Sequence, residues 1–180
     1  MQSNSDILVA FYLGKVADLS GRRIDEIWSW NYDELEYIHD YIQWLFPLRQ
    51  QSRYNPDAPL LDDEVIKTFR ANEQLRQRLL VSFRVMLKFY GLQYSEQPTG
   101  NIETVKSAEY PERKQNWLRI GNHNYLRITR ILTCMRSLGL EKYSQSLLDC
   151  LERIYSEEGK VIGETTLRFW REAVEISNNW

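Results

Sequence analysis

The segment from Asn31 to Phe46 constrains the fold more than any other part of the chain. Its apolar and aromatic residues recur at the spacing of a helix. At 100° per residue they cover about 200° of the circumference, roughly twice the apolar stripe of a surface helix. Asn31 and Glu34 have capping-box spacing, and Pro47 ends the segment. We therefore predict a central helix over Asn31–Phe46, whose polar stripe consists of Glu36, His39, Asp40 and Gln43.

The rest of the chain is also helical in pattern, with two irregular segments. Further helices are expected over residues 5–13, 62–71, 72–90, 122–138, 141–158 and 165–178, with a brief helical segment at residues 24–28. Gly91, Gly139 and Gly159 stand where helix C-terminal caps belong. Residues 48–61 read as a loop. The segment of about residues 92–121 is irregular, and part of it folds as a short hairpin or is mobile.

Composition supports a helical class. The 180 residues contain only 8 glycines and 5 prolines, which disfavours sandwiches and barrels. A chain of this length is expected to form about one domain. The fold class that we predict is therefore all-α, a compact single globular domain over residues 1–180 with about six or seven helices.

Targeting and cofactor signals are weak. Cys134 and Cys150 have no short pairing motif, and free thiols are typical of a reducing compartment. The N-terminus lacks the basic region of a secretory signal, and its apolar run is far shorter than a transmembrane segment. We expect a soluble, cytoplasmic protein. Glu36 and His39 have the spacing of half a di-iron site, but the second half is missing, so no metal is expected. The common catalytic motifs are also absent from the sequence, and no cofactor or catalytic residue is expected.

Two strings in the sequence are distinctive. The first, His39–Pro47, reads HDYIQWLFP, and the second, His123–Leu132, reads HNYLRITRIL. Together they resemble the opioid growth factor receptor conserved-domain family. Supporting matches cover Leu60–Phe69, Ser82–Gly91 and Ser137–Tyr143. The resemblance thus extends over nearly the whole chain.

The resemblance implies an all-α domain and, for animal members, a receptor for the pentapeptide methionine-enkephalin. It also implies that those members act inside the cell, in association with the nuclear envelope, and continue into long repeat-bearing tails. The present chain ends at Trp180 and has no basic nuclear-import cluster. We therefore expect a stand-alone, microbial member of the family.

The residues themselves predict a binding site. His123, Arg127 and Arg130 fall on one face at the start of a helix, where a carboxylate or phosphate would bind. We predict a non-enzymatic domain that binds a peptide, a protein or a small anionic ligand between the helices 31–46 and 122–138. The candidate ligand-binding residues are His39, Asp40, Gln43, Trp44, Asn122, His123, Arg127 and Arg130, with Glu36, Tyr37, Tyr41 and Arg119 as secondary candidates.

Other interpretations of the same residues stay open. Arg127 or Arg130 could form internal ion pairs with Glu36 and Asp40, because buried charges are usually paired. Trp44 and Phe46 fit a core role better than a ligand cage. The segment Arg113–Arg136 is basic, without an acidic residue, and could bind nucleic acid with Trp117 and Tyr125 as stacking platforms. The whole chain has a net charge of -2, which counts against that. A histidine enzyme using His39 or His123 is the weakest alternative.

Overall fold

The computed structural model describes residues 4–175, and the chain divides into two compact units, Met1–Val85 and Met86–Trp180. We call them the first and the second unit. The described residues form ten helices and one two-stranded antiparallel sheet. The prediction of a mostly helical fold is confirmed. The prediction that it is purely α-helical is wrong, and the helices outnumber the six or seven expected. That the chain is one domain stays a prediction.

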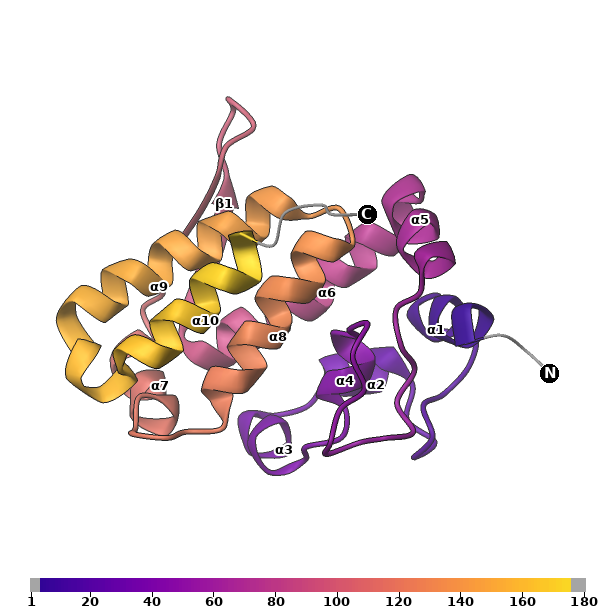
Figure 1. Ribbon diagram of the computed structural model, residues 1–180, viewed down its shortest axis with the longest axis horizontal. Coiled ribbons are helices and arrows are strands. Elements are labelled where there is room, and N and C mark those ends of the chain that lie inside the picture. The colour runs from indigo at the N-terminus through magenta and orange to yellow at the C-terminus, as the bar shows by residue number, and fades with distance from the viewer. Residues whose placement is uncertain (1–3, 176–180) are drawn as a thin grey trace. The chain divides into compact units, whose positions relative to one another are not determined.

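Five short helices and the first part of a long one make up the first unit (Figure 1). They are α1 (Asn4–Tyr12), α2 (Ile24–Trp28), α3 (Tyr32–Tyr37), α4 (Ile42–Leu45), α5 (Asp63–Ala71) and the start of α6 (Glu73–Tyr90). Polar contacts tie α2 to α6. The indole N–H of Trp28 donates to the Ser82 hydroxyl at 2.9 Å, and the Arg78 guanidinium lies 4.7 Å from the Trp28 ring. Arg78 also pairs with Asp25 at 2.9 Å.

The predicted central helix Asn31–Phe46 is wrong, because the chain breaks between α3 and α4. The capping box of Asn31 and Glu34 is confirmed, but Ile38 is extended, with φ −87° and ψ 130°. The Tyr41 hydroxyl donates to the Leu35 carbonyl at 2.9 Å, so the chain folds back onto α3. All seven residues from Tyr41 to Pro47 are buried. A helix with one polar stripe would expose some of them, so tertiary packing outweighs the helical pattern.

The helix boundaries on either side of α6 follow the predicted signals. The Asp62 carboxylate accepts the Val65 N–H at 2.8 Å and caps α5. Asn72 is extended and separates α5 from α6, which confirms the predicted break. Gly91 follows α6 with φ +76°, a conformation that favours glycine.

The second unit contains a hairpin and four further helices. They are β1 (Leu92–Glu96), β2 (Ile102–Lys106), α7 (Tyr110–Trp117), α8 (Asn124–Ser137), α9 (Glu141–Ile162) and α10 (Glu164–Glu175). In Figure 1, α8, α9 and α10 lie side by side and the hairpin projects beyond them. Tyr94 pairs with Thr104 in the hairpin, and α9 packs against β2. The Ser146 hydroxyl donates to Thr104 Oγ1 at 2.8 Å, and Arg153 donates to the Thr104 carbonyl at 2.7 Å.

Three details of this unit bear on the predictions. The hairpin alternative for the irregular segment is confirmed, whereas α7, with Pro111 in its first turn, was not expected. Gly139, with φ +92°, follows α8 as predicted. Gly159 is not a C-terminal cap, because α9 continues beyond a kink at Glu158 and ends at Gly163, where φ is +81°. The end of the predicted last helix, residues 176–178, lies outside the described residues.

Candidate functional site

The first distinctive string places Asp40 in a charged cluster of the first unit. Arg22 Nη1 lies 2.9 Å from Asp40 Oδ1, and the Ser20 hydroxyl donates to Asp40 Oδ2 at 3.1 Å. Arg22 Nε also donates to Asp18 Oδ2 at 2.7 Å. The turn from Asp18 to Arg22 builds this arrangement locally, because Asp18 Oδ1 accepts the main-chain N–H groups of Ser20 and Arg22, each at 2.9 Å.

Electrostatics in this cluster favour the ionised forms. Partial burial alone would raise the pKa of Asp40, but the hydrogen bond and charge of Arg22 outweigh it, so that this pKa lies below its ordinary value. Burial alone would lower the pKa of Arg22, but Asp40 and Asp18 raise it above its ordinary value. The Arg22 guanidinium also lies 5.5 Å from the Trp30 ring. Asp40 is therefore a fixed carboxylate at neutral pH.

Three exposed side chains belong to residues that are next in the chain to Asp40 or to a residue that contacts it. Leu19 is 69% exposed and precedes Ser20, and Tyr54 is 81% exposed and precedes Asn55, whose side chain donates to the Asp40 carbonyl. His39, the neighbour of Asp40 in the chain, is also exposed. The Asp40 side chain keeps 42% of its surface exposed. We call Leu19, His39, Asp40 and Tyr54 the Asp40 surface.

The other residues predicted in this segment differ in exposure. Tyr41, Gln43 and Trp44 are buried, while Tyr37 is 77% exposed. These three aromatic candidates, Tyr37, Tyr41 and Trp44, therefore do not share one exposed surface. The core interpretation of Trp44 and Phe46 is confirmed, and the Trp44 ring packs 5.0 Å from that of Phe11. Glu36 is half-buried.

The second string places its polar residues at the start of α8, in the second unit. Asn122 Oδ1 accepts the Asn124 N–H at 2.8 Å, and the Asn122 side chain donates to the Asn116 carbonyl at 3.1 Å. His123 is the residue that precedes the helix. Arg119 is exposed and donates to the Gln115 carbonyl at 2.8 Å.

The two arginines of the predicted anion site are more enclosed. Arg127 is only 5% exposed, and its Nη1 donates to Asn124 Oδ1 at 3.4 Å. The Tyr90 hydroxyl contacts the same oxygen at 3.4 Å. Burial lowers the pKa of Arg130, although the neighbouring Cys134 thiol opposes the shift. Pairing of either arginine with Glu36 or Asp40 would join the two units and stays a prediction.

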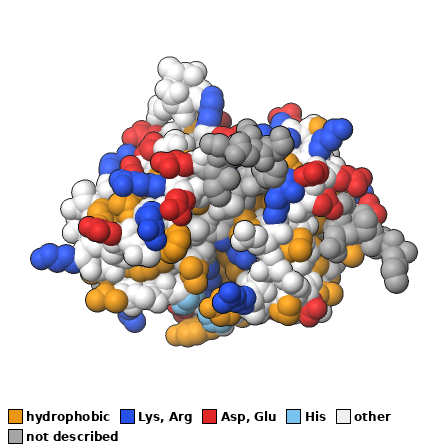
Figure 2. Space-filling view, in the orientation of Figure 1, with side chains coloured by type: hydrophobic (Ala, Val, Ile, Leu, Met, Phe, Trp, Pro, Cys, Tyr) orange, Lys and Arg blue, Asp and Glu red, His pale blue; other side chains and the backbone are white. Residues whose placement is uncertain are grey.

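The basic segment buries the two aromatic residues predicted as stacking platforms, while nucleic-acid binding itself stays a prediction. Trp117 is fully buried and donates to the Tyr90 carbonyl at 3.1 Å, and Tyr125 is only 6% exposed. Neither residue is available as a stacking platform, so this interpretation of both is wrong. Arg113 is buried and donates to the Phe89 carbonyl at 3.0 Å, and Lys114 pairs with Glu158 at 2.7 Å. Over α9 and α10, acidic and basic side chains are interspersed (Figure 2).

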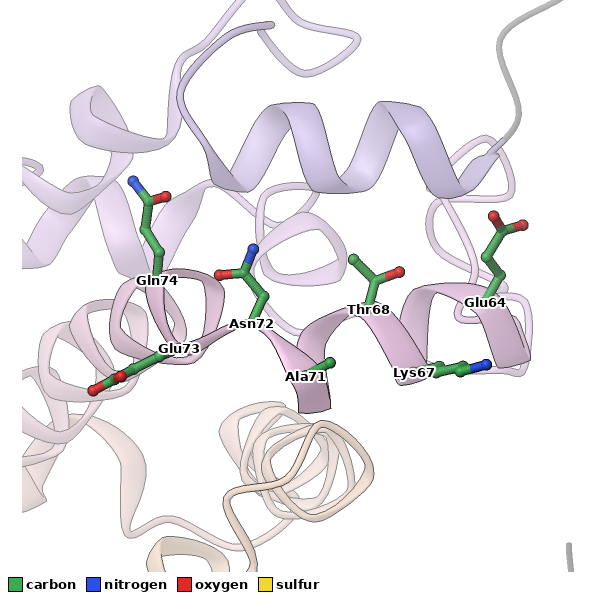
Figure 3. Close-up of a pocket in the computed structure, with 7 residues that line it drawn as sticks. All are labelled: Glu64, Lys67, Thr68, Ala71, Asn72, Glu73 and Gln74. Carbon is green, nitrogen blue, oxygen red and sulfur yellow. The ribbon is translucent and has the colours of Figure 1, made fainter.

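A surface hollow of about 760 Å³ lies where α5 meets α6 in the first unit. In Figure 3, Thr68, Asn72 and Gln74 point to one side of α5 and α6, whereas Lys67 does not point to that side. The hollow is lined by Glu64, Lys67, Thr68, Ala71, Asn72, Glu73 and Gln74. None of them is a predicted ligand residue.

Within residues 4–175, no helix combines the length and apolarity needed to cross a bilayer. The same residues hold no group of three or more His, Cys, Asp or Glu arranged to bind a metal ion. Cys134 and Cys150 are buried free thiols.

The sequence analysis did not identify several residues that contact Asp40 or adjoin such a residue. They come from two loops that lie far from Asp40 in the chain, and they are Leu19, Ser20, Arg22, Tyr54 and Asn55. The sequence carries a local signal for the first of these loops, because Asp18 is followed two residues later by Ser20. That pattern indicates a local turn. It does not indicate which distant carboxylate the turn will contact.

Known proteins match this chain over most of its length. Residues 2–178 match the model of the opioid growth factor receptor (OGFr) conserved region. The chain is 37% identical over 153 residues to opioid growth factor receptor-like protein 1 of Xenopus tropicalis, covering 82% of this chain and 29% of that protein. It is 37% identical over 154 residues to the opioid growth factor receptors of Homo sapiens and Mus musculus, covering 83% of this chain and 22% and 23% of those proteins.

The chain thus spans about a quarter of the length of these relatives, whose names are those of receptors and not of enzymes. No solved structure matches it. The chain belongs to the opioid growth factor receptor conserved-region family.

Proposed function

We propose that this chain is a non-enzymatic domain that binds a peptide through the Asp40 surface. The proposal extends to this chain the ligand in the relatives' name, an opioid growth factor, which the family resemblance identifies with a pentapeptide. The observation that carries it is the set of exposed side chains around one half-exposed carboxylate. Leu19 and Tyr54 are large and strongly exposed, and each adjoins a residue that contacts Asp40. Exposed apolar groups gathered at one place are typical of interaction surfaces.

The chemistry of this surface suits a peptide with a cationic group. The Asp40 carboxylate is held by Arg22 and Ser20, so it needs little ordering when a ligand binds. Its exposed part can accept hydrogen bonds from an ammonium or guanidinium group. Leu19 and Tyr54 offer apolar and aromatic surface next to Ser20 and Asn55, which contact Asp40. A small anionic ligand would instead suit the cluster of His123, Arg127 and Arg130 predicted at the start of α8, and that site stays a separate prediction.

Calorimetric titration of the full chain with methionine-enkephalin and with a set of unrelated short peptides tests the proposal. We expect at least one peptide to bind more tightly than millimolar. Asp40→Asn should weaken that binding by roughly tenfold, because it removes the charge from a charge-assisted hydrogen bond. Tyr54→Ala should also weaken it.

Glu26→Gln is the matched control, since Glu26 is an exposed carboxylate of the same unit outside the Asp40 surface. It should leave affinity unchanged. The thermal midpoint of each variant separates lost binding from lost folding, which matters because Asp40 also pairs with Arg22. Equal affinities of the Asp40→Asn variant and the parent chain would refute the assignment, and so would the absence of binding by every peptide.

A further inference from the structure

Residues 48–61 form a closed loop whose two ends meet. The Leu61 N–H donates to the Leu48 carbonyl at 3.0 Å, and Arg49 forms an ion pair with Asp63. Gln51 donates to the Pro56 carbonyl within the loop at 2.6 Å. A compact surface loop with adjoining ends is an Ω-loop, a type that is frequently functional.

Two side-chain hydrogen bonds connect this loop to the first distinctive string. Gln43 Nε2 donates to the Ser52 hydroxyl at 3.3 Å, and Asn55 Nδ2 donates to the Asp40 carbonyl at 3.1 Å. Gln43 is 5% exposed although its side chain is polar. A buried amide that is held by a surface loop becomes accessible if the loop moves.

The two loop side chains present the same pair of groups as a peptide bond. Ser52 supplies an oxygen that accepts from Gln43, as a peptide carbonyl would. Asn55 supplies an N–H that donates to the Asp40 carbonyl, as a peptide N–H would. The loop therefore satisfies a donor and an acceptor that would match the main chain of an extended ligand.

We propose that the Gln43 amide and the Asp40 carbonyl form a subsite for one peptide group of the ligand, and that loop 48–61 is its lid. This rests on the proposed function and names a part of the same site. At this point the lid forms two neutral hydrogen bonds, of 3.3 Å and 3.1 Å, and neither of them is charge-assisted. Most of its outer residues, including Arg53 and Tyr54, are exposed. Tyr54 lies on the lid and is already 81% exposed, so it moves with the lid when the lid opens.

The experiment compares three variants of the full chain. The double variant Ser52→Ala with Asn55→Ala removes both lid contacts, and Gln43→Met removes the amide while keeping a side chain of similar length. Ser29→Ala is the matched control, because it removes an exposed side-chain hydrogen bond of the first unit that lies outside the loop. The readouts are hydrogen exchange of residues 50–57, trypsin cleavage after Arg53, and titration with the peptides used above.

We expect the double variant to raise the rates of exchange and of cleavage after Arg53 by roughly tenfold, since each neutral hydrogen bond is worth about threefold to tenfold. Its peptide affinity should rise, because less of the binding free energy is used to open the lid. Gln43→Met should weaken peptide binding by roughly threefold to tenfold, the range for one neutral hydrogen bond. Ser29→Ala should match the parent chain in all three readouts.

Two results would overturn the subsite, and they differ. If peptides bind but the double variant and Gln43→Met bind them like the parent chain, the subsite is wrong while the proposed function stands. If neither the parent chain nor the opened double variant binds any peptide, the proposed function fails, and the subsite fails with it.

Discussion

Replacement of Tyr41 by phenylalanine tests why the predicted helix 31–46 is broken. The substitution deletes one hydroxyl, which donates to the Leu35 carbonyl at 2.9 Å inside the core. It keeps the ring, which packs edge-on to Trp30 with a centroid distance of 5.3 Å. We expect the free energy of unfolding to fall by about 1–2 kcal/mol, because removal of the donor leaves the buried Leu35 carbonyl without this hydrogen bond.

Urea denaturation followed by circular dichroism measures this change. With a slope of about 2 kcal/mol per molar urea, the midpoint should fall by about 0.5–1 M. Tyr37→Phe is the matched control, because Tyr37 ends α3 and its side chain is 77% exposed. It should change stability by less than about 0.5 kcal/mol. If Tyr41→Phe costs no more than Tyr37→Phe, the hydroxyl does not hold the break, and our account of this segment is wrong.

Three further predictions follow from single contacts. The pKa of Asp40, measured by NMR titration, should lie below its ordinary value and return toward it in Arg22→Gln. The contribution of the Asp40–Arg22 pair to folding stability is present above the unfolded pKa of Asp40 and is lost as pH falls through its folded pKa. An unchanged Asp40 pKa in the variant would contradict the pairing. Gly91→Ala should lower the free energy of unfolding, measured by urea denaturation, by roughly 1–3 kcal/mol more than Gly100→Ala does. Both glycines have positive φ, but only at Gly91 would the new methyl group lie 2.7 Å from a main-chain atom, Tyr110 Cα. Equal losses in the two variants would refute the clash. Burial raises the pKa of both Cys134 and Cys150, so a thiol reagent should modify them in the unfolded chain but only slowly in the folded one, and rapid labelling of the folded chain would count against this burial.

Local signals were enough to predict most helix boundaries. The capping box at Asn31, the cap at Asp62 and the glycine after α6 each depend on residues within a few positions of one another. Such contacts are encoded by short spacing, so they can be read without knowing the fold. The hairpin also came from local punctuation, although α7 has no clear apolar stripe and was missed.

Contacts between distant segments could not be read in the same way. The break at Ile38 depends on burial of every residue from Tyr41 to Pro47. The spacing of the apolar residues alone instead predicts that this run continues the helix that begins at residue 31. The kink at Glu158 is similar, since Glu158 pairs with Lys114 from another helix. The partners of Asp40 come from two loops that carry no apolar pattern.

The difference between the two distinctive strings changes where a ligand is expected. From spacing alone, Arg127 and Arg130 form the centre of an anion site, because charge and helical phase are all that a sequence displays. In the structure Arg127 is buried beside Asn124, whereas Asp40 keeps an exposed carboxylate edge among strongly exposed neighbours. A ligand must reach a group before it can be attracted by that group's charge. The accessible charge at the proposed peptide site is therefore negative, and cationic peptides, rather than anions, should be tried on it first.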